Sequence, residues 1–85
     1  MSEVLSEADL NEIEARVAAA TAGPWKSFVE GRDHTSGSHF IRTGGEEDIE
    51  LSGATIADQD FIAAARQDVP GLIAHIRTLQ KLLGA

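Results

Sequence analysis

The segment ADQDFIAAARQDVP, residues 57–70, contains the strongest helix signals in the chain. Asp58 is a good N-cap residue, because its carboxylate can accept a hydrogen bond from a backbone N–H of the first helical turn. The alanines that follow favour a helix, and Phe61 and Ile62 give it an apolar face. These features predict a helix over about residues 58–66.

A second helix is predicted directly afterwards, over about residues 69–83. Asp68 can cap it, and Pro70 falls in its first turn, where a missing backbone N–H costs little. Four of its apolar residues follow the spacing of a helix-packing seam, namely Leu72, Ile76, Leu79 and Leu83. Ile73 and Leu82 lie beside that seam and widen the apolar face. This face is wider than a small domain needs, which predicts a homo-oligomer interface; the alternative, that all of it is intramolecular core, stays open.

The N-terminal part predicts another helix, over about residues 7–21. Ser6 and Asp9 have the spacing of a capping box, in which each side chain bonds the backbone N–H of the other residue. Apolar residues then recur every three or four positions. Gly23 and Pro24 end the helix.

Three short segments between the helices have the residue types of β-strands: residues 25–30, 39–43 and 48–52. Turn-forming residues separate them, as an antiparallel meander requires. The predicted fold class is therefore α+β, with an N-terminal helix, a three-stranded antiparallel meander and two C-terminal helices. A chain of 85 residues is expected to form a single domain, over residues 1–85.

The composition indicates a cytoplasmic protein. There is no cysteine, which excludes disulfides and thiolate metal sites and fits a reducing compartment. The first residues lack the basic start and apolar core of a signal peptide, and no apolar run approaches the roughly 20 residues that cross a bilayer. We therefore expect no membrane partner.

The net charge of −7 is unevenly distributed along the chain. It disfavours binding to a nucleic-acid polymer, because both carry negative charge. Residues 24–45, however, contain three bases against two acids, whereas residues 46–60 contain six acids and no base. A small anion would therefore bind in the middle segment, and a basic protein target would bind the acidic one.

Eight residues are candidates for binding an anionic, nucleotide-like ligand. Guanidinium and hydroxyl groups suit phosphate oxygens, and an aromatic ring beside them can stack on a nucleobase. The candidates are Trp25, Lys26, Arg32, His34, His39, Arg42 and Thr43 in the middle segment and Arg66 in the following helix. If the first two strands pair, Lys26 and Arg42 lie on neighbouring strands. Two alternatives stay open: Trp25 can be a core anchor, and the bases can merely balance nearby acids.

Neither a metal site nor a catalytic site is predicted. His34 and His39, with Asp33 alongside, have no specific metal-ligand spacing. No nucleophile motif, P-loop or dinucleotide-binding glycine motif is present. We therefore expect no enzyme activity, no cofactor and no metal.

Two blocks resemble a group of short phage proteins. The first is AAATAGPW, residues 18–25, and the second is DQDFIAAAR, residues 58–66, followed by DVP and a leucine-rich helix. In this order they resemble Ead-type accessory proteins of phages and prophages, in which such blocks flank a variable strand region. Ala22 stands where that pattern has proline, and Gln59 where it has a small residue. The resemblance implies a phage accessory protein in the host cytoplasm and implies no catalytic residues.

The leading functional hypothesis joins this resemblance to the basic middle segment. Small phage accessory proteins often act against host systems by covering a protein surface or by sequestering a small molecule. We expect a homo-oligomeric binding protein that sequesters a phosphate-bearing nucleotide signal of host defence without turnover. The alternative is an acidic inhibitor or immunity-type protein that masks a basic target with residues 46–60, and a small enzyme is a third.

Overall fold

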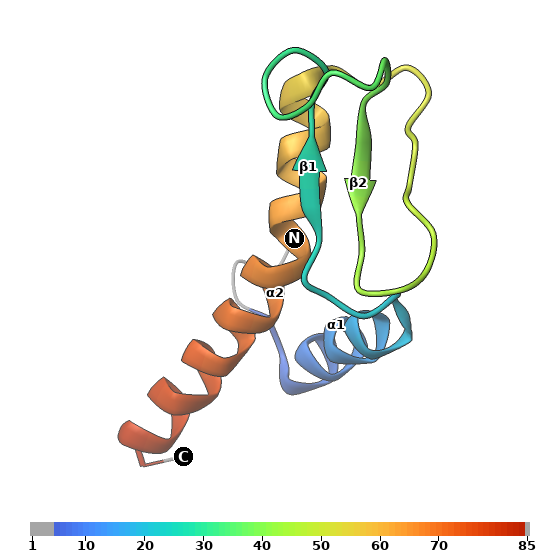
Figure 1. The fold of residues 1–85 in the computed structure, drawn as a ribbon. Coiled ribbons are helices and arrows are strands. Elements are labelled where there is room, and N and C mark those ends of the chain that lie inside the picture. Colours follow the sequence, from blue (N-terminus) through green and yellow to red (C-terminus); the bar gives the residue numbers. More distant parts are fainter. Residues whose placement is uncertain (1–4, 85) are drawn as a thin grey trace.

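The computed structural model describes residues 5–84 and confirms a mixed α+β fold (Figure 1). In chain order its elements are α1 (Glu7–Ala19), β1 (Lys26–Phe28), β2 (Phe40–Arg42) and α2 (Ile56–Leu82). The two strands lie beside the N-terminal half of α2, and α1 packs against α2 further along (Figure 1). The long helix α2 therefore connects two separate packing regions.

Helix α1 begins where the sequence predicts. The Ser6 hydroxyl accepts a hydrogen bond from the backbone N–H of Asp9 at 3.1 Å, and the Asp9 carboxylate accepts one from the N–H of Ser6 at 2.9 Å. These bonds form the predicted capping box and lower the pKa of Asp9. The helix ends at Ala19, before the predicted residue 21, because Ala20 already has an extended backbone conformation.

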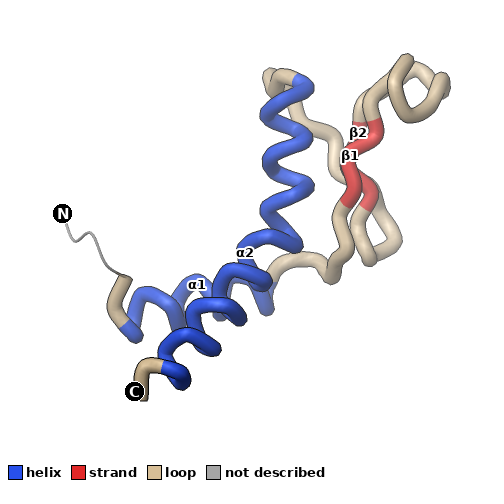
Figure 2. The backbone as a smooth tube through the Cα atoms, turned by 90° about the vertical axis from the view of Figure 1, so that its left-hand side faces the viewer, coloured by secondary structure: helices blue, strands red, loops and turns tan. Residues whose placement is uncertain are grey.

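The prediction of two C-terminal helices is wrong, because α2 is one continuous helix that contains Pro70. Its N-cap is Thr55, and Asp58, the predicted cap, is instead the third residue of the helix, where it is the partner of Thr55 in a second capping box. Asp68, the predicted cap of the second helix, lies inside α2 and does not begin a helix. A proline inside a helix removes one backbone hydrogen bond, and its ring crowds the carbonyl four residues earlier. The helix bends there when the residues on both sides favour the helical conformation. The axis of α2 accordingly changes direction near its middle (Figure 2).

The sheet has two strands, so the prediction of a three-stranded meander is also wrong. The third predicted strand, residues 48–52, makes a single bridge in which Ile49 and Ile41 exchange backbone hydrogen bonds of 2.8 and 2.9 Å. Pairing stops there because the chain after β2 leaves the sheet in a wide loop held by the Thr43 side chain. The register of the two strands pairs Lys26 with Arg42, Ser27 with Ile41 and Phe28 with Phe40.

The buried apolar side chains form two small groups rather than one core. Val29, Ile41 and Ala63 are buried where the strands meet α2, and Leu10 and Ile73 are buried where α1 meets α2. The radius of gyration is 16.0 Å, whereas a compact domain of this length has about 12 Å. No helix in residues 5–84 combines the length and apolar character needed to span a bilayer.

A buried glutamine joins α2 to both strands. Gln59 is 4% exposed, and its amide nitrogen donates to the Ser27 hydroxyl at 2.8 Å. The same nitrogen lies 3.2 Å from the carbonyl oxygens of Phe28 and Phe40. One side chain therefore fixes the position of the helix relative to each strand.

Substitution of Gln59 by alanine should destabilise the fold by about 1–3 kcal/mol, because three partly buried acceptors lose their donor. The matched control is Gln80→Ala, at a glutamine near the C-terminal end of α2 and away from the strands. Urea unfolding followed by circular dichroism measures both variants. An equal, small effect of the two substitutions would contradict a joining role for Gln59.

Candidate ligand-binding face

Four side chains of the two strands project from the side of the sheet that faces away from α2. Ser27 and Ile41 face α2, since Ser27 bonds Gln59 and Ile41 is fully buried. Side chains alternate along a strand, so the neighbours of these two residues point the opposite way. We call this surface the outer face, and it consists of Lys26, Phe28, Phe40 and Arg42.

The outer face places two cations over one aromatic ring. Lys26 Nζ lies 5.1 Å and Arg42 Cζ 4.7 Å from the centroid of the Phe28 ring. The Phe40 ring stacks on Phe28 with centroids 5.2 Å apart and an angle of 10° between the planes. Both cations are exposed, and neither forms an ion pair within residues 5–84. The negative face of the ring therefore offsets part of their positive charge, and the Asp33 carboxylate acts on Lys26 from beyond ion-pair distance.

The register makes this charge arrangement unfavourable in the absence of an anion. Lys26 and Arg42 are directly opposite each other, and like charges at opposed positions of an antiparallel pair are destabilising. The prediction that these two residues lie on neighbouring strands is confirmed. Phe28 was not among the predicted candidates, although the alternation of side chains along a strand places it on the same face of the sheet as Lys26.

The two candidate histidines support the loop between the strands. The His34 ring packs 5.1 Å from Phe40, and its Nδ1 accepts a hydrogen bond from the backbone N–H of Ser36 at 3.1 Å. His39 Nδ1 accepts one from the N–H of Glu30 at 3.0 Å. The imidazoles thus bond different segments of the loop, and residues 5–84 contain no cluster of three potential metal ligands.

Arg32 is paired within the protein. Its guanidinium donates to both carboxylate oxygens of Asp60 at 2.9 and 3.0 Å, and its Nε donates to Asp33 at 3.0 Å. These bonds raise the pKa of Arg32 and lower that of Asp60 to about 2, with a smaller contribution from the Ser27 hydroxyl. Arg32 therefore connects the loop after β1 to α2 and is not available as a simple anion ligand.

Trp25 and Arg66 hold the segment that links α1 to β1. The Trp25 indole donates to the carbonyl oxygens of Thr21 and Ala22 at 3.0 and 3.2 Å, and Arg66 Nε also donates to Thr21 at 3.0 Å. The Gln67 amide bonds both backbone groups of Trp25, so this segment is attached to α2. These contacts support the anchor alternative for Trp25.

The remaining candidate, Thr43, is buried beneath the loop after β2. Its hydroxyl donates to the carbonyl of Glu47 at 3.1 Å and accepts from the N–H of Gly45 at 3.0 Å. Gly44 crosses the α1–β1 segment so closely that a Cβ there would lie 2.7 Å from the carbonyl oxygen of Ala22. Of the eight candidates, the structure thus brings Lys26 and Arg42 together on one exposed surface, and it brings Trp25 and Arg66 together at the Thr21 carbonyl.

Only the geometry of the outer face indicates what it binds. No protein-family model, curated protein or solved structure matches this chain. Three surface hollows of residues 5–84 are lined by α2 together with either α1 or the loop of residues 51–54, and neither Lys26 nor Arg42 lines any of these three. The outer face is an exposed surface that carries two cations.

The Arg32–Asp60 pair should contribute to stability in a pH-dependent way. The pKa of Asp60 falls from 3.8 to about 2 on folding, so its contribution is complete above pH 3.8 and is lost as the pH falls toward 2. We expect Asp60→Asn to lose less stability than the wild type between about pH 4 and pH 2. Thermal melts across this range measure the difference.

Asp48→Asn, at an exposed acid on the loop after β2, is the control and should follow the wild-type pH profile. Parallel curves for Asp60→Asn and the wild type over the same range would refute the pairing.

Proposed function

We propose that the protein binds a small phosphate-bearing, nucleotide-like ligand on the outer face and sequesters it without turnover. The observation that carries this proposal is the placement of Lys26 directly opposite Arg42, with both cationic groups over the Phe28 ring. A phosphate between them would accept hydrogen bonds from the ammonium and from two guanidinium nitrogens. It would also remove the repulsion that the register creates.

The aromatic part of the outer face suits the rest of a nucleotide. Phe28 and Phe40 form a stacked pair and are only partly buried. An aromatic ring of this kind can stack on any nucleobase, and such a contact is worth about 1–3 kcal/mol. Phosphate on the cations and base beside the rings together account for binding without a catalytic group.

Sequestration is the proposed role because the outer face offers charge and stacking. The resemblance of residues 18–25 and 58–66 to Ead-type phage accessory proteins supports a role against a host signal. The net charge of −7 supports a small ligand over a nucleic-acid polymer, which a chain of this charge repels.

Binding is tested by isothermal titration with a panel of cyclic and ADP-ribose-type nucleotides. Lys26→Gln and Arg42→Gln should each weaken binding about tenfold or more, since a hydrogen bond to a charged group contributes about 1.5–3 kcal/mol. Lys81→Gln removes one positive charge from the far end of α2 and is the matched control. It should bind like the wild type.

The state of the bound ligand separates sequestration from catalysis. After denaturation of the complex, chromatography should recover the nucleotide intact, whereas a released product would establish an enzyme. Absence of binding across the panel, or equal affinities of wild type, Lys26→Gln and Arg42→Gln, would rule out the outer face as the site.

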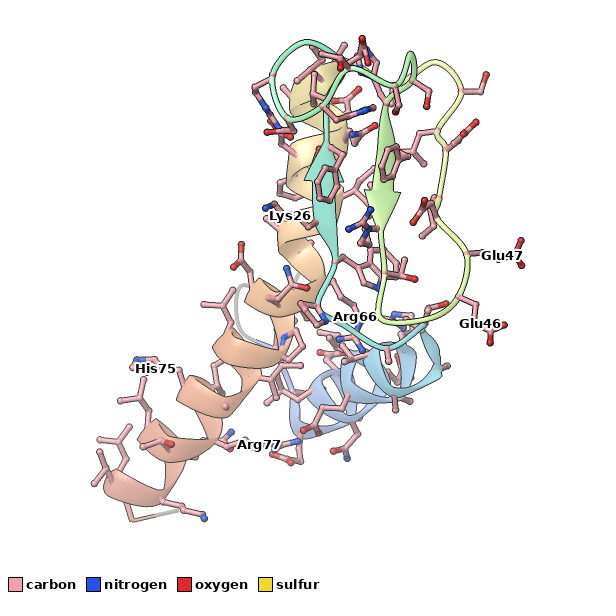
Figure 3. The ribbon with its side chains drawn as sticks, viewed as in Figure 1. Lys26, Glu46, Glu47, Arg66, His75 and Arg77 are labelled. Carbon is pink, nitrogen blue, oxygen red and sulfur yellow. The ribbon has the colours of Figure 1, made fainter. Side chains whose placement is uncertain are left out.

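A second candidate function is inhibition of a basic protein by the acidic loop after β2. Glu46 and Glu47 are exposed and point away from the body of the protein (Figure 3). Asp58 and Asp60 of the same acidic segment are already bonded within the chain. The acidic surface proposed for this role therefore narrows to residues 46–50.

Charge reversal tests this second candidate. Glu46→Lys with Glu47→Lys should abolish capture of a basic target, while Glu12→Lys, at an exposed position of α1, should have little effect. Pull-down from host lysate with each variant makes the comparison. Identical captured proteins for the wild type, the double variant and Glu12→Lys would eliminate the acidic loop as an interface.

A further inference from the structure

The C-terminal part of α2 exposes a row of large apolar side chains. We call residues 72–83 the arm, which extends past the strands toward the C-terminus (Figures 1 and 2). Leu72, Leu79, Leu82 and Leu83 are 61, 43, 76 and 84% exposed. Together they leave more apolar side chain in water than two fully exposed leucines would.

Helix α1 covers the other side of the arm. Ile73 is buried, and the Arg77 guanidinium bonds Glu7, Asn11 and Glu14 of α1. Successive residues turn by about 100° around a helix, so the exposed leucines point away from α1. Ile73, one of the predicted interface residues, is therefore part of the α1–α2 contact, and the other five remain at least partly exposed.

The exposed row has the pattern of a helix-pairing seam. Leu72, Ile76, Leu79 and Leu83 follow each other at spacings of four, three and four residues, which places them on one stripe. No acid, arginine or lysine lies in this stripe, because Arg77 is turned toward α1 and Lys81 falls on a different side of the helix; His75 lies beside the stripe. The stripe therefore fits an uncharged apolar helix.

We propose that the arm pairs with the arm of a second copy of this chain, in antiparallel orientation about a two-fold axis. The same stripe of a second copy supplies the uncharged, 3–4 spaced apolar partner that this surface requires. Leu72 of one copy then lies opposite Leu83 of the other, and Ile76 opposite Leu79. Each arm becomes covered on both sides, by α1 of its own chain and by the partner arm.

The antiparallel orientation keeps the two sheets apart. The strands lie beside the N-terminal half of α2, so antiparallel arms place the two sheets at opposite ends of the dimer (Figure 1). Antiparallel helices also bring opposite ends of their dipoles together. The arm is only about 18 Å long, which we expect to bury less than the roughly 800 Å² per partner of a stable complex. We expect a dimer that dissociates on dilution.

Light scattering measures the mass of the assembly as a function of concentration. We expect twice the chain mass of 9.0 kDa at high concentration and a single chain after dilution. Leu79→Gln should shift the midpoint at least tenfold toward higher concentration, with unchanged helix content by circular dichroism. Thr78→Gln, outside the stripe, is the control and should dimerise like the wild type.

Cross-linking determines the orientation, and the absence of cysteine makes each introduced thiol unique. Leu72→Cys and Leu83→Cys are prepared separately, mixed and oxidised. The antiparallel dimer should give a disulfide between the two different variants and little within either one, because like positions are about 16 Å apart and a disulfide needs Cα atoms within about 7 Å.

Three outcomes would overturn the proposal. They are a single-chain mass up to about 1 mM, a dimer that Leu79→Gln leaves unchanged, and disulfides that form within each variant as readily as between them. The cross-linking result does not depend on the Leu79→Gln protein folding. None of these measurements involves a nucleotide, so the dimer and the outer face are tested independently.

Discussion

The amide of Gln59 is the contact on which the arrangement of this small protein depends. A sheet of two three-residue strands buries too little apolar surface to be stable alone. Gln59 attaches it to a 27-residue helix by bonding Ser27 on one strand and lying within hydrogen-bonding distance of carbonyl oxygens on both. The register thus held between the strands determines the outer face, because it sets Lys26 opposite Arg42.

Local signals predicted the start of α1 but not the long-range arrangement. Ser6 and Asp9 predicted their capping box because both partners are three residues apart. Pro70 was misjudged because a proline is favourable at a helix start, whereas inside a helix it costs about 3 kcal/mol and either ends the helix or bends it. The packing of the neighbouring residues decides between these outcomes. The third strand failed for a related reason: strand-forming residues do not reveal that the loop before Ile49 keeps all but one residue out of pairing distance.

The candidate site was partly predictable, because some of its features depend on residue type and local pairing and others on long-range contacts. Residue type identified the bases, and strand pairing brought Lys26 and Arg42 together. Residue type could not indicate that Arg32 and Arg66 have partners far along the chain, in Asp60 and Thr21. A guanidinium suits an internal carboxylate or carbonyl as well as it suits a ligand phosphate.

The attachment of Trp25 determines which part of the molecule tryptophan fluorescence can monitor. It is the only tryptophan in the chain, and it lies in a hollow lined by α1 and α2 while its backbone bonds the side chain of Gln67. Its fluorescence is therefore a local probe of the junction between α1, β1 and α2. Trp25 is attached to α2 at Gln67, and the arm extends from there toward the C-terminus (Figure 1). Fraying of the last helical turns would therefore leave the fluorescence unchanged and would be visible in circular dichroism.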